Sequence, residues 1–173
     1  VLARQFMASH GTELRHFAMV SAKNSVHGSL NPRAQFREAI SVEEVLAQPV
    51  IVDPLTRPMI CPLADGGAAV VLVSERKARQ LGMARMIRVE AAQLHSGWDY
   101  GAGEETVAER CANLLYESAG IGPADLDCVE LHDASAPAEI LYYEYLGLCA
   151  RGEGGHFVEA GHSQLGGRLP VNT

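Results

Sequence analysis

The stretch Cys128-Val129-Glu130-Leu131-His132-Asp133 says more about the fold of this chain than any other. Its apolar, β-type residues predict a strand, and the Ala-, Leu- and Tyr-rich segment after it predicts a helix. Loops between a strand and a helix stand on a rigid support and often carry functional side chains. His132 at such a junction can act as an acid, a base or a hydrogen-bond donor near neutral pH. On spacing alone, a structural histidine is the commoner outcome.

Strand and helix patterns alternate on both sides of this stretch, which predicts an α/β fold. Runs of small, apolar and β-branched residues predict strands at 66–73, 86–94 and 127–131. A helix is predicted at 106–119, because apolar side chains recur on one face and Gly120 follows.

Helix starts are also marked by local capping signals. Ser41 and Glu44 have the spacing of a capping box, and Ser74 has the position of an N-cap. Residues 2–16 have a helical pattern that is interrupted at Gly11.

The composition is that of an ordinary globular chain and excludes some classes of function. The 173 residues are 47% hydrophobic and 20% charged, with a net charge of −7. An acidic chain is a poor non-specific ligand for nucleic acid, so no nucleic-acid partner is expected. No apolar run is long enough for a membrane span, and no signal pattern is present. We therefore expect a cytoplasmic protein, or a peroxisomal one in a eukaryote.

Neither a disulfide nor a metal site is expected. No two cysteines have a C-x-x-C spacing, and three lie in apolar contexts, which favours small buried thiols. The seven histidines are scattered without a metal-ligand spacing. The four cysteines are Cys61, Cys111, Cys128 and Cys149.

Residues 128–154, CVELHDASAPAEILYYEYLGLCARGEG, resemble the thiolase family. The likeness is greatest to the branch typified by the thiolase domain of sterol carrier protein x, with its "VELHDCF" strand end and "NELLTYEALGLCPEG" helix. Residues 10–36 resemble the family pattern "YGT..EHFA....KN..H...NP.SQF". Residues 61–69, CPLADGGAA, resemble "CPTSDGAAA", and residues 161–167, GHSQLGG, resemble "GDNTYGG". Each motif is weak, but four in family order are a strong signal.

The resemblance implies a thiolase-like layered α/β/α/β/α fold, incomplete in this chain because family members are about twice as long. Residues 1–65 would correspond to the loop domain, and 66–85 to the last strand and helix of the N-terminal half. Residues 86–173 would be part of the C-terminal half. The nucleophilic Cys would lie upstream, so this chain alone is expected to have little or no turnover.

The implied function is part of an acyl-CoA acyltransferase that cleaves 3-oxoacyl-CoA or runs the reverse Claisen condensation. Coenzyme A would be a co-substrate, with no permanently bound cofactor, and the protein would be a homo-oligomer. His132 takes a position that holds Asn or His in the family and would stabilise an oxyanion. His16 and His27 would line the acyl-CoA pocket, and Ser135 would make it wider or more polar. Asp133 is expected to cap the following helix.

Two alternatives remain open. One is a thiolase-like aldolase that acts on a steroid side-chain CoA ester with an OB-fold partner protein. His132 argues against it, because such relatives tend to carry Tyr there, whereas Ala134-Ser135 leaves room for it. The other is a non-catalytic scaffold that binds lipid or a partner. Cys61 matches a non-catalytic family position, and Tyr143 is expected to pack in the core.

Overall fold

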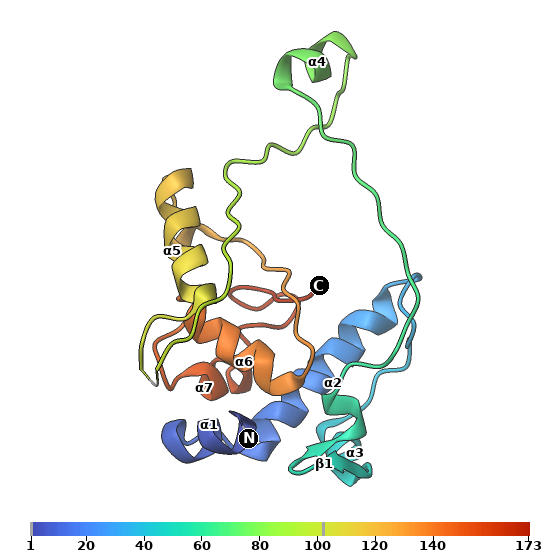
Figure 1. Cartoon of the computed structure of the whole chain (residues 1–173). Helices are drawn as coiled ribbons and strands as arrows, with labels where there is room; N and C mark the ends of the chain where they lie inside the picture. Colours follow the sequence, from blue (N-terminus) through green and yellow to red (C-terminus); the bar gives the residue numbers. More distant parts are fainter. Residues whose placement is uncertain (1, 102) are drawn as a thin grey trace.

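The computed structural model describes residues 2–101 and 103–173 (Figure 1). In chain order its elements are α1 (Leu2–His10), α2 (Leu14–Leu30), α3 (Val42–Ala47), β1 (Val50–Val52), β2 (Leu55–Thr56), the 3₁₀ helix η1 (Arg57–Met59), α4 (Glu75–Gln80), α5 (Val107–Ala119), the 3₁₀ helix η2 (Pro123–Asp125), α6 (Ala136–Tyr145) and α7 (Gly154–Glu159).

The long helix α2 organises the core. It packs against α3, α6 and α7, and its Phe17 and Val20 are completely buried. Ile140 and Tyr143 of α6 belong to the same core, as expected for Tyr143. Burial of each such side chain contributes roughly 1.5–3 kcal/mol to stability.

Two glycines at the start of α7 allow this close packing. A Cβ atom at Gly154 would lie 2.7 Å from Ile140 Cγ2, and one at Gly155 would lie 2.7 Å from His16 Nδ1. Both distances are too short for real atoms. The small residues therefore set how closely α7 approaches α6 and α2.

The helices predicted from capping signals are confirmed. Ser41 and Glu44 form a reciprocal capping box at α3, and Ser74 Oγ accepts a hydrogen bond from Lys77 N at α4. The helix predicted at 106–119 from its apolar face is also present as α5; Thr106 caps it, and it ends at Gly120 with φ of 69°. These signals are reliable because a cap involves residues that are close in sequence.

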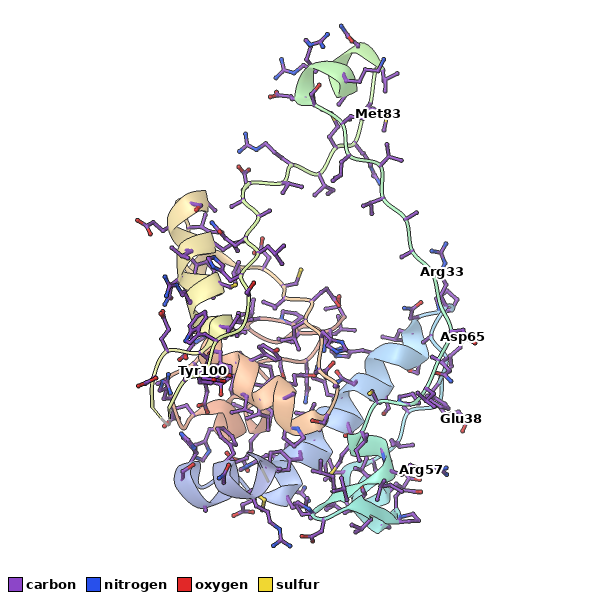
Figure 2. The ribbon with its side chains drawn as sticks, viewed as in Figure 1. Arg33, Glu38, Arg57, Asp65, Met83 and Tyr100 are labelled. Atoms are coloured by element: carbon purple, nitrogen blue, oxygen red, sulfur yellow. The ribbon has the colours of Figure 1, made fainter. Side chains whose placement is uncertain are left out.

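The strand predictions at 66–73 and 86–94 are wrong for this chain. Both segments are extended but join no sheet among the described residues, and they are exposed. They lead to α4, which lies away from the helical body, and back (Figure 1), and the side chains around Met83 project away from that body (Figure 2). The returning segment reaches α5, where Gln93 Nε2 donates to Ser118 Oγ at 3.2 Å. A strand needs a neighbouring strand for its backbone hydrogen bonds, and none lies beside these segments in the described chain.

The prediction for 127–131 is met only by one bridge. Val129 pairs in parallel with Val171, and Val129 N donates to Pro170 O at 3.0 Å. The sheet of the described residues is the antiparallel pair β1–β2.

The expectation of buried thiols is also wrong for two of the cysteines. Cys61 and Cys128 are exposed, Cys111 and Cys149 are half-buried, and all four are free. Cys61 lies two residues after the buried Met59, and Cys128 lies next to Val129, which bridges to Val171. An apolar neighbour in the sequence therefore did not make either thiol buried. Within the described ranges, no helix has the length and apolar character needed to cross a membrane.

The isolated chain is expected to self-associate. Val71, Ile87 and Leu94 are 89%, 96% and 95% exposed, and apolar surface of this extent drives association. The double variant Val71→Lys, Ile87→Lys should reduce the association seen in sedimentation. Leu30→Lys, at an exposed apolar residue of α2, should not reduce it. A compact monomer across micromolar concentrations would contradict this expectation.

Candidate active site

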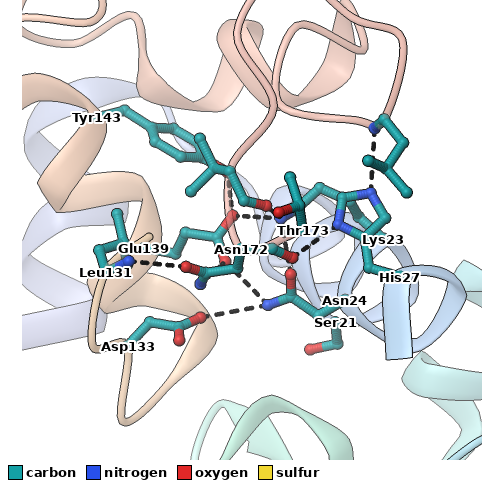
Figure 3. A network of polar contacts seen from close by, with 12 residues as sticks. Ser21, Lys23, Asn24, His27, Leu131, Asp133, Glu139, Tyr143, Asn172 and Thr173 are labelled. Atoms are coloured by element: carbon teal, nitrogen blue, oxygen red, sulfur yellow. Dashed lines mark hydrogen bonds and ion pairs between the residues drawn. The ribbon is translucent and has the colours of Figure 1, made fainter. Parts of the chain in front are cut away.

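A polar cluster lies where α2, the segment before α6, α6 itself and the C-terminal segment meet (Figure 3). We define it by five side chains: Lys23, Asn24, Asp133, Glu139 and Asn172. They come from three distant parts of the sequence and are joined by hydrogen bonds and one ion pair.

A buried ion pair stands at the centre of the polar cluster. Lys23 Nζ lies 2.8 Å from Glu139 Oε1, and the two side chains are 1% and 0% exposed. Lys23 Nζ also donates to Asn24 Oδ1 and to Val171 O, each at 2.7 Å. Charges can be buried in this way only when they are paired and their hydrogen bonds are satisfied.

Glu139 accepts hydrogen bonds on both carboxylate oxygens. Tyr143 Oη donates to Oε1, while Asn24 Nδ2 and Asn172 Nδ2 donate to Oε2 at 2.8 and 3.3 Å. Burial, and then the negative charge of Glu139, raises the pKa of Tyr143 above its ordinary value. Tyr143 therefore stays a neutral hydrogen-bond donor.

Asp133 belongs to the polar cluster and does not cap α6, so the expected cap is wrong. Ser135 has the N-cap position of α6 without a side-chain hydrogen bond. Asp133 Oδ2 instead accepts from Asn24 Nδ2 at 3.2 Å. Burial, and then the neighbouring Glu139, raises the pKa of Asp133 to about 7.

The C-terminal segment holds the backbone that carries His132. Asn172 N donates to Val129 O, and Leu131 N donates to Asn172 Oδ1, both at 2.9 Å. Asn172 has φ of 55°, a left-handed conformation that Asn tolerates better than most residues.

His27 links the same segment to the loop after α7. Leu165 N donates to His27 Nε2 at 3.1 Å, and His27 Nδ1 lies 2.8 Å from Asn172 O. Because a backbone N–H can only donate, Nε2 is the acceptor and Nδ1 carries the proton. Both ring nitrogens of His27 are therefore used by the backbone, which is a positioning role.

A cavity of about 330 Å³ lies beside the polar cluster. His27 lines it, and so do Leu131 and Asp133, the two neighbours of His132. His132 itself is exposed and is not among the lining residues. The full lining is Asn24, His27, Gly28, Asn31, Glu130, Leu131, Asp133, Asn172 and Thr173.

His16 and Ser135 are not brought to this cavity. His16 Nδ1 accepts from Glu13 N at 3.0 Å in a capping box of α2, and its Nε2 lies 3.8 Å from Glu159 Oε2. Ser135 bridges to Ile60 at the start of α6. The contacts of His16 are those of a structural residue at the α2–α7 contact.

Sequence reasoning missed the polar cluster apart from Asp133. A usable signal was present, because Asn24 follows Val20 by four residues on the buried side of α2. Glu139 similarly precedes the buried Tyr143 by four residues on α6. Polar residues at such helical positions indicate a buried hydrogen-bond network.

No group of three or more His, Cys, Asp or Glu side chains in the described part of the chain is arranged to hold a metal ion. Burial raises the pKa of the Cys149 thiol to about 12, which makes Cys149 a poor nucleophile.

Comparison with known proteins defines the class to which this fold and site belong. Residues 88–173 match the thiolase C-terminal domain-like family. The chain is 41% identical, over 98% of its length, to the benzoylsuccinyl-CoA thiolase subunit BbsB of Thauera aromatica, of which it covers 45%. It is 33% identical over 98% of its length to sterol carrier protein 2 of Oryctolagus cuniculus, covering 32% of that protein.

An acetyl-CoA acetyltransferase of Methanothermobacter thermautotrophicus is 35% identical over 99% of this chain and 46% of its own length. Among solved structures, the Ltp2-ChsH2(DUF35) aldolase matches with a TM-score of 0.83 and 29% identity. That match covers 98% of this chain and 47% of the other. The chain belongs to the thiolase family and has an incomplete thiolase-like fold. It spans less than half the length of these relatives.

Proposed function

We propose that this chain forms part of a thiolase-type acyl-CoA acyltransferase. The enzyme would cleave a 3-oxoacyl-CoA with coenzyme A, or run the reverse Claisen condensation. The observation that carries the proposal is the position of His132, which is exposed between two residues held by the polar cluster. Leu131 is held by Asn172, and Asp133 is held by Asn24.

In this proposal His132 donates a hydrogen bond to the thioester oxygen of the substrate. Negative charge builds on that oxygen when the nucleophile attacks or when an enolate forms. A donor that is already in place stabilises this charge without reorganisation, and its removal typically costs on the order of a hundredfold in rate.

The remaining chemical roles are assigned by chemistry and by the relatives. Burial makes the Cys149 thiol a poor nucleophile, Cys61 matches a family position that resembles a non-catalytic one, and the relatives are more than twice as long as this chain. We therefore assign the Cys that carries the acyl group to residues outside this chain. Coenzyme A is the co-substrate, with no permanently bound cofactor, and the enzyme is a homo-oligomer.

The substrate pocket is assigned to the cavity beside the polar cluster and the start of α6. His27 would support one wall of it through the backbone groups that it binds. Ser135 does not line this cavity and bridges to Ile60 instead, so the proposal gives it no contact with the substrate. The capping contacts of His16 favour a structural role over a substrate contact.

An aldolase function is the second candidate, because the matched solved structure is that of an aldolase. By analogy with that complex, an aldolase of this type would use a separate partner protein. The two functions differ in their chemistry. Thiolysis consumes coenzyme A and yields two thioesters, whereas aldol cleavage of a 3-hydroxyacyl-CoA yields one thioester and a free carbonyl compound.

The full-length protein should therefore be assayed with both substrate classes. We expect cleavage of a 3-oxoacyl-CoA only when free coenzyme A is added, with two thioester products detected by mass spectrometry. A 3-hydroxyacyl-CoA should remain intact. Release of a carbonyl compound without consumption of coenzyme A would replace the thiolase proposal by the aldolase one. No turnover of either class would support a non-catalytic scaffold.

A further inference from the structure

We infer that Asn24 is a positioning residue, and that its hydrogen bond to Asp133 holds His132 in place. The inference rests on the proposed function, because the assigned task of His132 is oxyanion stabilisation. It goes beyond that function by naming a residue of α2 that is distant in sequence and has no catalytic task of its own.

The orientation of the Asn24 amide follows from its neighbours. Lys23 Nζ can only donate, so the atom 2.7 Å away must be the amide oxygen of Asn24. The amide nitrogen consequently points to the two carboxylates, with Nδ2 at 2.8 Å from Glu139 Oε2 and 3.2 Å from Asp133 Oδ2. One amide therefore ties the residue after His132 to the buried ion pair (Figure 3).

The residue before His132 is tied to the same carboxylate by a second amide. Leu131 N donates to Asn172 Oδ1, and Asn172 Nδ2 donates to Glu139 Oε2. The short segment 131–133 is thus held at both ends by amides that share one buried oxygen. Since Glu139 is completely buried and paired with Lys23, this anchor is rigid.

The charges around Asp133 make this link sensitive to substitution. Glu139 of α6 and Lys23 of α2 act on Asp133 with opposite signs. Asn24 Nδ2 donates to both carboxylates. An Asp at this position would keep an acceptor for Lys23, but it would offer Asp133 a like charge in place of a donor.

Variants of the full-length enzyme separate positioning from catalysis by Asp133. Asp133→Asn keeps a side-chain oxygen that accepts from Asn24, so it should lower kcat clearly less than Asp133→Ala does. Asp133→Ala and Asn24→Asp both break the link. Each should lower kcat on the order of tenfold to a hundredfold with KM changed less than about twofold, since a small misplacement of a catalytic group is costly.

A matched control exists on the surface of α5. Asn113 Nδ2 also donates to a carboxylate oxygen, Glu105 Oε1 at 3.2 Å, but it is exposed and outside the cavity lining. Asn113→Asp repeats the chemical change of Asn24→Asp and should leave kcat unchanged. In the double variant Asn24→Asp, Asp133→Ala the two losses should not add, because both remove one interaction.

Each contrary outcome has a separate meaning. If Asp133→Ala keeps wild-type kcat per folded molecule, the positioning inference is overturned, even if Asn24→Asp fails to fold. If Asp133→Asn is as slow as Asp133→Ala, Asp133 acts chemically and the inference is also overturned. His132→Ala is measured in parallel: normal turnover there would refute the proposed function, whereas a slow His132→Ala beside a normal Asp133→Ala refutes only the positioning role.

Discussion

Replacement of His132 by alanine in the full-length protein is expected to lower kcat on the order of a hundredfold. The loss should appear equally in kcat/KM, because an oxyanion donor acts where charge develops and adds little to ground-state binding. Binding of the CoA ester should remain nearly intact. Steady-state kinetics with a 3-oxoacyl-CoA and coenzyme A would measure both constants.

His132→Asn should be milder, because Asn can still donate a hydrogen bond. His156→Ala is a suitable control, since His156 is an exposed histidine of α7 outside the cavity beside the polar cluster. If His132 were structural, both His132 variants would lower the melting temperature while turnover per folded molecule stayed normal. That result would remove His132 from the site.

Replacement of Lys23 by methionine is expected to destabilise the full-length protein by roughly 3–5 kcal/mol. The change removes the positive partner of Glu139, which is completely buried and would keep an uncompensated charge. It also removes the donor that orients Asn24. Urea unfolding followed by circular dichroism would measure the change in the free energy of unfolding.

An exposed ion pair supplies the control for this second prediction. Arg15 Nη1 lies 3.2 Å from Glu43 Oε1 with both side chains exposed, so Arg15→Met should cost less than about 1 kcal/mol. Adding Glu139→Gln to Lys23→Met should recover part of the loss, because no buried charge then remains. Equal losses in the free energy of unfolding for Lys23→Met and Arg15→Met would show that the buried ion pair contributes no more to stability than the exposed one.

Elements defined by neighbours in sequence were predicted well. The capping box at Ser41 and the helix stop at Gly120 are local features, and the helices that they bound are present. The strand predictions at 66–73 and 86–94 were wrong because a strand depends on contacts with residues that are distant in sequence. Their apolar residues are typical of a buried strand, but a strand also needs a neighbouring strand for its backbone hydrogen bonds, and the local sequence does not specify that neighbour.

In the candidate site, too, the local motifs were predictable from the sequence, whereas the contacts between distant residues were not. The motif around His132 was visible in the sequence. The family motif over residues 10–36 includes Lys23 and Asn24, to which no task was assigned, and His27, which was expected to line the acyl-CoA pocket. That His27 binds two backbone groups, and that His16 caps α2 far from the cavity, depends on contacts between distant segments.

The sequence by itself determined the family, the capped helices and the His-Asp junction before α6, because motifs and caps are read from residues close along the chain. Only the tertiary structure decided that Asp133 faces Asn24 and Glu139 and not the end of its own helix. The physical reason is burial. When α2 and α6 pack together, Lys23 and Glu139 are removed from water, so their charges must be paired and hydrogen-bonded within the protein. Asn24 and Asn172 supply hydrogen bonds to Glu139, and Asn24 also donates to Asp133.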